Sequence, residues 1–461
     1  MAESDKWAAN ANEALSLQLV GAPSPADKLF GPEFTYQVGF GQEETIFGYT
    51  RLDIRLSFTP SNLHTLLSVT FSAVNESTTA KIDDIPSILE EYLPEDYTTD
   101  AEVFGKRLEE EEKSDFTPFG EKVGEYDVPA AARKGKGKGQ GKRSAPGASS
   151  SKGTASGSAA SNADSDHFEV YRTTWATPGW REFHRRMQLF ALLYIEGASY
   201  IHEDEENWQW LTTWHKSVDA EGRIKYVFVG YTSLYRFWHY PSSSRLRLSQ
   251  FLILPPYHKQ SHGTHLYQIA YSSTLESDSI TELTVEDPNE AFDRLRDTAD
   301  LKRLLAPGAI IEQMKEEEGG LRSPLDRVRS ERWRLKAKIA KRQWSRLIEM
   351  IQLMELDPSD PVAIKAYRLQ VKARLYRFNK DILTQLTLQE RHLKLQETYE
   401  SLLEGEYGDL VGVDVEPFLD GPGGEDDDDE EDDGGLAQGN GWLGMFGGGG
   451  AAGGGGKRRK V

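Results

Sequence analysis

Cysteine is absent from this sequence of 461 residues. Its absence excludes disulfide bonds, thiolate zinc sites and a cysteine nucleophile, and it is typical of a reducing intracellular compartment. The sequence also lacks a run of ~18 apolar residues, the length that a membrane-spanning helix needs. The first residues, MAESDKWAANANEAL, do not have the charged and then apolar layout of a signal peptide. We therefore expect a soluble protein that is not secreted.

Basic residues are fewer than acidic ones, which gives a formal net charge of −20 at pH 7. The acidic run EDDDDEEDD, from Glu425 to Asp433, carries part of this charge, and the rest of the chain is acidic as well. Such a surface repels nucleic acid and attracts basic partners, whether peptides or whole proteins. Net acidity also keeps a protein soluble, so charge alone does not establish a basic partner. We expect no direct contact with nucleic acid or membrane.

Composition divides the chain into domains and linkers, and its hydrophobic content of 38% is enough for two or three packed cores. Residues 7–128 mix short alternating segments with polar turns, which predicts a mixed α/β lobe. Residues 129–165 are rich in Lys, Gly and Ser and predict a disordered linker. Strand and helix patterns alternate over residues 166–305, which predicts an α/β sheet domain. A helical bundle is expected over 306–408, followed by a disordered acidic and glycine-rich tail, 409–461. The predicted fold class is α+β or mixed α/β.

Local patterns place the main elements. A helix is predicted over 178–196, and strands are predicted in WQWLTTWHK, IKYVFVGYTSLYRFW and RLRLSQFLIL. A second helix pattern starts near His262, and the strand SITELTVED and the helix NEAFDRLRD follow. Ser323 and Pro324 have the character of a helix N-cap and a first-turn proline. Breaks at 357–361 and 377–379 divide the C-terminal part into about three helices that end near Tyr407.

The segment FLILPPYHKQSHGTHLYQ, residues 251–268, predicts a strand that stops at two prolines and restarts as a helix. The turn amides and the first helical amides then lack partners, and together with the helix dipole they favour a polyanion such as a pyrophosphate. Lys259, Gln260 and Ser261 add donors, and Gly263 permits close approach of the backbone. The glycine spacing fits neither a P-loop nor a dinucleotide fingerprint, and a turn of this composition is often only a turn.

The turn resembles the pyrophosphate loop of the GCN5-related N-acetyltransferases, whose pattern is Gln or Arg, two residues, Gly, one residue, and Gly or Ala. In this sequence the register is His258-Lys259-Gln260-Ser261-His262-Gly263. His258 stands where Gln or Arg is usual, and Ser261 stands where Gly is usual. The Ser261 side chain would either crowd the phosphate or hydrogen-bond to it.

The motifs LTVEDPNEAFDRLRD, YIEGASYI, VGYTSLYRFWHYP, SQFLILPPY and FGQEETIFGY resemble the type B histone acetyltransferase catalytic subunit in a fungal form. This family acetylates newly made histones before their deposition on DNA. The resemblance covers the N-terminal lobe, the sheet domain and the helical region, but neither the linker nor the tail. It implies a histone lysine N-acetyltransferase that uses acetyl-CoA and no metal.

Acetyl transfer to lysine needs a neutral amine, whereas free lysine has a pKa of ~10.4. A carboxylate in a partly dry pocket is a suitable general base, acting directly or through water. The resemblance assigns this role to Glu286, with Asp287 and Glu196 as supporting or competing carboxylates. An acid ahead of Pro288 also fits ordinary helix capping equally well. Because cysteine is absent, direct attack by the lysine is the remaining mechanism.

The resemblance also implies the binding residues. The backbone of Phe251, Leu252 and Ile253 would hold the acetyl and pantetheine arm like an added strand. The amides from His258 to Thr264, through Lys259, Gln260, Ser261, His262 and Gly263, would bind the pyrophosphate, and Asn289 would add a contact. The N-terminal tail of histone four is the implied substrate, with Glu43 and Glu44, and Gln42 in place of a further acid, on its acidic side. Trp208, Tyr235, Arg236 and Phe237 would form its aromatic side, although Trp208, Trp210, Trp214 and Trp238 also suit a plain sheet core.

Two segments remain open to interpretation. The Gly-Lys alternation RKGKGKGQGKR, from Arg133 to Arg143, is either a pseudosubstrate in cis or a solvated basic linker. The terminal KRRKV resembles a nuclear signal, so we expect both cytoplasmic and nuclear locations. The family implies a WD-repeat β-propeller partner that binds histones. A histone escort with a decayed coenzyme site, and an acetyltransferase for small amines, are the alternative functions.

Overall fold

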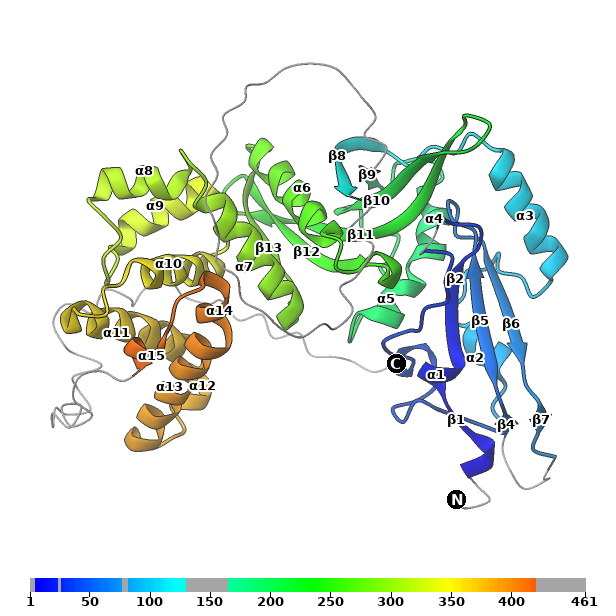
Figure 1. Cartoon of the computed structure of the whole chain (residues 1–461), viewed down its shortest axis with the longest axis horizontal. Coiled ribbons are helices and arrows are strands. Elements are labelled where there is room, and N and C mark those ends of the chain that lie inside the picture. Colours follow the sequence, from blue (N-terminus) through cyan, green and yellow to red (C-terminus); the bar gives the residue numbers. More distant parts are fainter. Residues whose placement is uncertain (1–4, 24–25, 77–81, 130–164, 420–461) are drawn as a thin grey trace, which may run out of the picture. The chain divides into compact units, whose positions relative to one another are not determined.

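The computed structural model describes residues 5–23, 26–76, 82–129 and 165–419 (Figure 1). The Gly-Lys segment 133–143, the acidic run and KRRKV lie outside the described residues. The chain divides into two compact units, one made of residues 1–321 and 325–348 and the other of 322–324 and 349–461. Together they form a mixed α+β protein in which the sheets belong to the first unit.

Short strands build the N-terminal part of the first unit (Figure 1). Its three-stranded sheet has the order β2–β5–β6, in which β2 is parallel to β5 and β5 is antiparallel to β6. Leucines alternate along β2 and point into the core, as the two-residue period of a strand requires. The strands of this sheet are β2 (Leu15–Leu19), β5 (Asp53–Phe58) and β6 (Thr65–Thr70).

Smaller elements surround this sheet. Two antiparallel pairs join β1 to β3 and β4 to β7. Their bounds are β1 (Ala8–Asn10), β3 (Thr45–Phe47), β4 (Tyr49–Thr50) and β7 (Ala73–Val74). The helical segments are η1 (Asp5–Trp7), α1 (Ala11–Ala14), η2 (Tyr36–Val38), α2 (Ile85–Glu90) and α3 (Ala101–Lys113).

A six-stranded sheet forms the centre of the first unit, in the order β13-β12-β11-β10-β9-β8. All neighbours are antiparallel except β12 and β13, which are parallel. The strands are β8 (Glu121–Pro129), β9 (Ser165–Thr174), β10 (Trp208–Val218), β11 (Ile224–His239), β12 (Ser243–Ile253) and β13 (Ile280–Val285). Strand β8 comes before the composition change at 129, yet it pairs with β9 because Tyr126 and Val128 are buried in this sheet. The sheet therefore draws on residues from both sides of the predicted linker.

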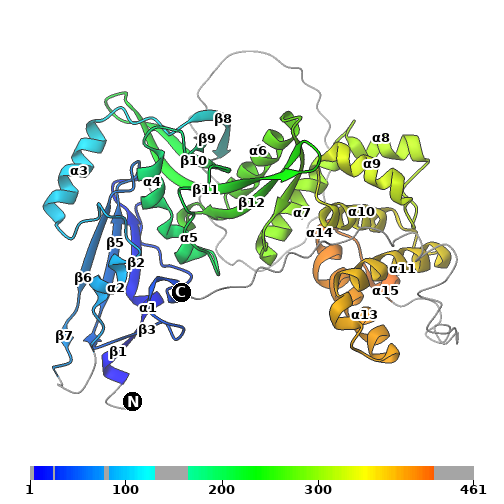
Figure 2. The ribbon, with the colours of Figure 1, turned by 180° about the vertical axis from the view of Figure 1, so that it is seen from behind.

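Helices cover both faces of the central sheet (Figures 1 and 2). Helix α6 (His262–Glu276) lies on the face that carries Tyr126 and Phe168. On the other face, Phe183 of α4 packs against Trp214 and Phe228. The helix predicted over 178–196 is divided in two at Gln188, giving α4 (Trp180–Met187) and α5 (Leu189–Tyr194).

The first unit continues as helices. After the 3-10 turn η4 (Pro255–Tyr257) and α6, the chain forms α7 (Glu290–Leu304), α8 (Ile310–Glu318) and α9 (Arg327–Ala337). Helix α10 (Lys341–Glu355) begins in the first unit and continues into the second, which starts again at Glu349. The prediction that Ser323 and Pro324 begin a helix is wrong. Helix α9 starts at Arg327, because the Asp326 side chain accepts the hydrogen bond from the Arg329 amide and serves as its N-cap.

The second unit is helical. Its segments are α11 (Pro361–Phe378), α12 (Lys380–Leu383), α13 (Leu388–Leu402), the π-helix η5 (Leu403–Tyr407), α14 (Gly408–Val411) and α15 (Glu416–Leu419). The breaks predicted at 357–361 and 377–379 are confirmed, since Asp360 caps the start of α11 and that helix ends at Phe378. Within the described residues, no helix is long and apolar enough to cross a membrane.

Candidate functional site at the open edge of the central sheet

Several backbone amides at the corner between β12 and α6 have no hydrogen-bond acceptor in the part of the chain that the structure describes. Helix α6 begins at His262, after a turn in which Lys259 and Ser261 have positive φ angles of 59° and 69°. The prediction that the His258 amide binds the pyrophosphate is wrong, because this amide donates to the carbonyl of Pro255 at 3.0 Å. Among the described residues, none accepts a hydrogen bond from the amides of residues 259–264, and the first bonded amide of the helix is that of His265. Successive amides in such a turn form a concave donor group that suits an anion, and the helix dipole adds to it.

Side chains in this turn brace it from within. The imidazole Nε2 of His258 lies 2.6 Å from the carbonyl oxygen of Ile253, and the Gln260 side chain donates to the carbonyl of Pro256 at 2.9 Å. Gln260 is buried. These two side chains therefore hold the turn in shape, whereas Lys259 and Ser261 are exposed.

His262 anchors the helix start to the sheet. Its side chain is 1% exposed, and its Nδ1 lies 2.9 Å from the Tyr126 hydroxyl. Burial, and then the neighbouring histidines His265 and His215, lower the pKa of His262 to about 3, so its ring is neutral at pH 7. Gly263 serves packing, because a Cβ at this position would lie 2.9 Å from Leu295 Cδ1 and 3.5 Å from Phe251 Cε1.

Strand β12 has an edge that β13 does not cover. The parallel pairing ends at Leu248 with Val285, while β12 continues to Ile253. The Leu252 carbonyl group points toward β11, as shown by its oxygen, which would lie only 2.3 Å from a Cβ on Gly230. Alternation along a strand directs the amides of Phe251 and Ile253 to the opposite, open edge. An extended ligand could add there as a short strand.

Glu286 is the first residue after β13, and its backbone amide still donates to the carbonyl of Leu248 at 2.9 Å. One carboxylate oxygen lies 3.1 Å from Arg247 Nη2, and the other accepts the Ser249 hydroxyl at 2.5 Å. The Glu286 side chain is 36% exposed. A carboxylate that is oriented on both oxygens and still open to solvent can accept a proton from a bound substrate.

The other predicted residues near this position have different surroundings. Asp287 is exposed and adopts a φ of 33°, so it forms the turn out of β13. Asn289 is the N-cap of α7, since its side chain accepts the Phe292 amide at 2.9 Å. Glu196 is exposed beyond the end of α5, and no hydrogen bond or ion pair within the described residues joins it to Glu286 or Asp287.

An aromatic row leads across the sheet to Glu286. Trp208 of β10 stands opposite Tyr235 of β11 with ring centroids 4.8 Å apart, and Tyr235 lies 4.5 Å from Phe237. The Arg247 guanidinium carbon lies 4.5 Å from the Phe237 ring centroid, and Arg247 pairs with Glu286. We call Trp208, Tyr235 and Phe237 the aromatic row. The structure therefore brings predicted tail-binding and catalytic residues together.

Other predicted tail-binding residues have structural partners or lie at the surface. Arg236 is exposed and donates to the hydroxyls of Ser244 and Ser279. Gln42 and Glu43 are exposed in the turn before β3. Glu44 accepts the Thr35 and Tyr36 amides at 2.7 and 3.2 Å, and its pKa is lowered chiefly by the Thr35 bond, although burial opposes this shift. Of the four tryptophans, Trp210 and Trp214 belong to the core, whereas Trp238 is 71% exposed.

Arg247 and Ser249 are absent from the predicted site, although both orient Glu286. Their only sequence signal is alternation, because RLRLSQFLIL places Arg245, Arg247 and Ser249 on one side of the strand and leucines on the other. The register of β12 relative to β13 makes the contact, and no local pattern reports that register. A bulge in the β11–β12 pairing between Thr232 and Leu234 further alters which side chains share a face near Ser249.

Two further clusters contain ionisable groups. Glu125, His167 and Glu169 place ligand atoms within 4.8 Å of one another. Lys216 and Lys122 already donate to one Glu169 oxygen at 2.9 and 3.4 Å, so a divalent cation would have to displace them. Burial opposes the charge on Glu169, but bonds from Lys216 and two tyrosines lower its pKa to about 2. We assign no metal to this group.

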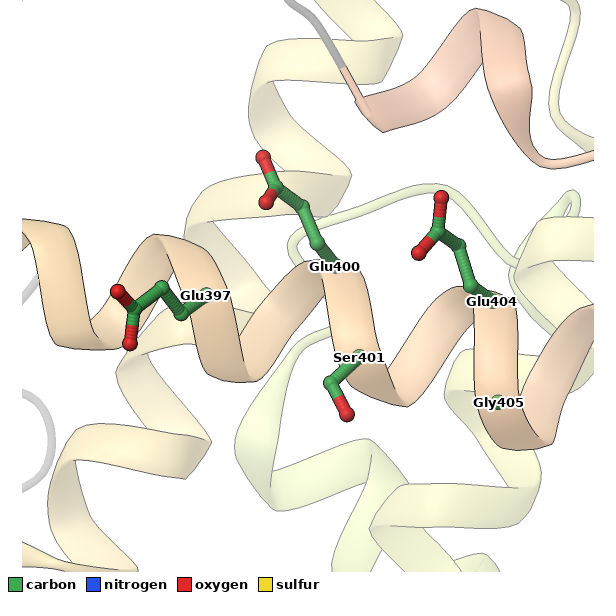
Figure 3. A pocket seen from close by; sticks show the side chains of 5 residues that line it. All are labelled: Glu397, Glu400, Ser401, Glu404 and Gly405. Atoms are coloured by element: carbon green, nitrogen blue, oxygen red, sulfur yellow. The ribbon is translucent and has the colours of Figure 1, made fainter.

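A pocket in the second unit lies on the surface of α13 and η5 (Figure 3). Three of its side chains are carboxylates that project from one continuous helix. Its lining residues are Glu397, Glu400, Ser401, Glu404 and Gly405. None of the predicted site residues lines it, and acids on one helix face are ordinary solvated groups.

The geometry at the open edge suits acyl transfer to an amine. Unpartnered amides for a phosphate group, a free strand edge for an extended arm and an oriented carboxylate occur within one sheet and its first crossover helix.

Comparison with known proteins identifies the family. Residues 7–196 match the family model "Histone acetyl transferase HAT1 N-terminus", and residues 297–357 match "Fungal HAT1, C-terminal". The histone acetyltransferase type B catalytic subunit of Mycosarcoma maydis is 49% identical over 424 residues, which cover 91% of this chain and 92% of the relative. That of Cryptococcus neoformans is 43% identical and covers 90% of this chain and 99% of its own. The chain belongs to the family of type B histone acetyltransferase catalytic subunits.

A solved structure of an aminoglycoside acetyltransferase from an uncultured soil metagenomic sample is also similar. It is 15% identical, with a TM-score of 0.21, and the match covers 29% of this chain and 85% of that chain.

Proposed function

We propose that this protein transfers an acetyl group from acetyl-CoA to a lysine in the N-terminal tail of newly made histone four, with Glu286 as general base. The observation that carries the proposal is the position of Glu286 beside the open edge of β12, whose far end leads into the unpartnered amides of residues 259–264. The family membership supports a histone substrate. The same membership supports cytoplasmic and nuclear locations and a WD-repeat histone-binding partner.

The residues at this edge fit acetyl-CoA. The amides of residues 259–264 would bind the pyrophosphate, with Lys259 as the nearby cation, and the amides of Phe251 and Ile253 would face the pantetheine arm and the thioester carbonyl. His258 and Gln260 would support this loop from behind instead of contacting phosphate, because their side chains already bond to backbone carbonyls. Acetyl-CoA supplies an activated acyl carbon that a neutral amine can attack.

The protein residues would carry out the proton transfer. Glu286 removes a proton from the lysine ammonium, directly or through one water, and the freed amine attacks the thioester carbonyl. A C–N bond forms, the C–S bond breaks, and the proton that the new amide nitrogen loses passes to the departing sulfur, which leaves as a thiol. The aromatic row would hold the lysine stem and the glycine-rich backbone of the tail, and exposed Glu43 would attract its charge.

Glu286→Gln tests the base. We expect kcat to fall roughly 100-fold to 10,000-fold, because the amide cannot accept the proton. The affinity for acetyl-CoA, measured by calorimetry, should stay unchanged, since the coenzyme amides are elsewhere. Glu276→Gln at the exposed end of α6 is the matched control and should retain activity. Full activity of Glu286→Gln would move the base to Asp287 or Glu196.

Two measurements separate the alternative functions. Absence of acetyl-CoA binding in the unmodified protein would favour a histone escort with a decayed site. Acetylation of spermidine as efficiently as a histone four tail peptide would favour a small-amine acetyltransferase. We expect coenzyme binding and a clear preference for the peptide.

A further inference from the structure

We propose that Arg247 is a positioning residue for Glu286 and couples the aromatic row to the base. The proposal rests on the proposed function of Glu286. In this role Arg247 does not contact the substrate and affects the reaction only by orienting Glu286. Three observations carry it: the contacts on Glu286, the contact on Phe237 and the strand that Arg247 occupies.

The first observation is that the two oxygens of Glu286 are held separately. Arg247 Nη2 lies 3.1 Å from Oε1, and the Ser249 hydroxyl donates to Oε2 at 2.5 Å. The terminal torsion of a glutamate is broad, so a single contact would leave the carboxylate plane free to turn. Two contacts on different oxygens define that plane. Because Glu286 is 36% exposed, packing alone does not confine it.

The second observation is that the aromatic row confines Arg247. The guanidinium carbon lies 4.5 Å from the Phe237 ring centroid, and Phe237 packs against Tyr235 at 4.5 Å. Tyr235 in turn contacts Trp208 at 4.8 Å. A cation over a ring contributes about 0.5–1 kcal/mol at exposed sites. The face of Phe237 thus selects the rotamer in which Arg247 reaches Glu286.

The third observation is that one strand carries both the side chains that orient Glu286 and the amides that would hold the thioester. Arg247 and Ser249 belong to β12, and the same strand presents the amides of Phe251 and Ile253 at the open edge. A strand rises ~3.3 Å per residue, so the groups that orient the base begin about 7 Å from those that would hold the thioester. A displacement of ~1 Å between reacting groups costs about 100-fold in rate. Arg247 therefore acts on turnover.

The charge of Arg247 separates this role from substrate binding. A cationic tail is repelled by an arginine, so removal of the charge should leave the KM for the tail unchanged or lower it. A positioning role predicts a fall in kcat at the same time. A tail-binding residue does not produce this combination of a lower kcat and a KM that does not rise. The double-mutant cycle below separates positioning from a purely structural loss of active enzyme.

The experiment compares Arg247→Met, Arg247→Lys and Phe237→Leu with Arg245→Met, using a histone four tail peptide and acetyl-CoA. Arg245 lies two residues earlier on the same strand and pairs with Glu282, which makes it the matched control. We expect Arg247→Met to lower kcat about 10–100-fold without raising the KM for the peptide. Arg247→Lys should recover part of this loss, because lysine keeps the charge but not the planar fork. Phe237→Leu should lower kcat less, and Arg245→Met should leave it unchanged.

A double-mutant cycle tests whether Arg247 acts through the base. In the Glu286→Gln background, Arg247→Met should reduce kcat by no more than about twofold, because the group that it positions is already inactive. A full multiplicative loss in that background, or a raised peptide KM with normal kcat, would overturn the proposal. Full activity of Glu286→Gln alone would instead refute the proposed base. Circular dichroism melting checks that each variant is folded. If Arg247→Met does not fold, the fall in kcat of Phe237→Leu still tests the proposal.

Discussion

Two glutamates in different units of this chain are held by arginine in different ways. In the second unit, the Glu349 side chain is 2% exposed, and Arg374 binds both of its oxygens, at 2.7 and 2.8 Å. Tyr407 donates a further bond at 2.9 Å. At the open edge of the first unit, the Glu286 side chain is 36% exposed and has one arginine and one serine.

The difference indicates which carboxylate stabilises structure and which can react. A buried carboxylate such as Glu349, which Arg374 and Tyr407 already bond, is out of reach of a substrate, and its removal takes the anionic partner away from a largely buried guanidinium. A half-exposed carboxylate such as Glu286 is oriented but reachable. An ion pair with arginine therefore does not by itself indicate a catalytic carboxylate. The carboxylate must also be exposed enough for a substrate to reach it.

The largest expected stability change follows from the buried pair. Glu349→Leu should destabilise the helical unit by about 3–5 kcal/mol, because the largely buried Arg374 would lose its carboxylate. Glu349→Leu combined with Arg374→Met should recover most of this loss. Urea unfolding followed by tryptophan fluorescence and circular dichroism measures both. Equal stability of Glu349→Leu and the unmodified protein would contradict the contrast drawn with Glu286.

A smaller effect separates the neighbours Glu44 and Glu43. Glu44→Gln should cost about 1–3 kcal/mol, because one carboxylate oxygen accepts the Thr35 and Tyr36 amides and the other accepts the Asn12 side-chain amide, and a glutamine cannot accept on both sides. Glu43→Gln should change stability by less than ~0.5 kcal/mol. It should instead raise the KM for the tail peptide, more at low than at high salt. Thermal melting and peptide kinetics at two salt concentrations test the pair, and a large melting shift in Glu43→Gln would reverse the assignment.

The smallest effect concerns His262 and appears as a pH dependence. Its pKa is about 3 in the folded state, below the ordinary value of 6.5. Below pH 6.5 this histidine is therefore protonated in the unfolded chain but neutral in the folded one. As the pH is lowered, the free energy of unfolding decreases by up to about 1.4 kcal/mol per pH unit. His262→Phe should show a shallower fall between pH 6.5 and 4.5, in urea titrations at several pH values. Parallel slopes for the two proteins would exclude this role of His262.

Local sequence patterns predicted much of the framework. Helix α6 begins at His262, where the prolines and the polar turn placed it, and β13 and α7 occupy the segments SITELTVED and NEAFDRLRD. These elements depend on alternation, turn residues and caps, which act over a few neighbouring positions. The start of α9 was misplaced because Ser323 and Asp326 are both acceptable caps, and only Asp326 is used.

The candidate site was predicted less completely, because its contacts join distant positions. Ser249 and Glu286 are 37 residues apart in sequence, and their contact exists only because β12 and β13 pair in one register. Glu44 was predicted to contact the histone tail, and the sequence did not indicate that its carboxylate accepts backbone amides in the N-terminal lobe. Gly263 was predicted to let the backbone approach a phosphate, and the structure adds that its missing side chain makes room for Leu295 and Phe251.

The amino-acid sequence by itself determined the order of strands and helices, the corner after Ile253 and the absence of any cysteine chemistry, because these properties depend on composition and short-range periodicity. The tertiary structure alone decided which carboxylate remains reachable, which arginine orients it and which aromatic rings approach it. Those outcomes depend on strand register and on the bulge in β12. A shift of one residue would turn each side chain to the opposite face of the sheet.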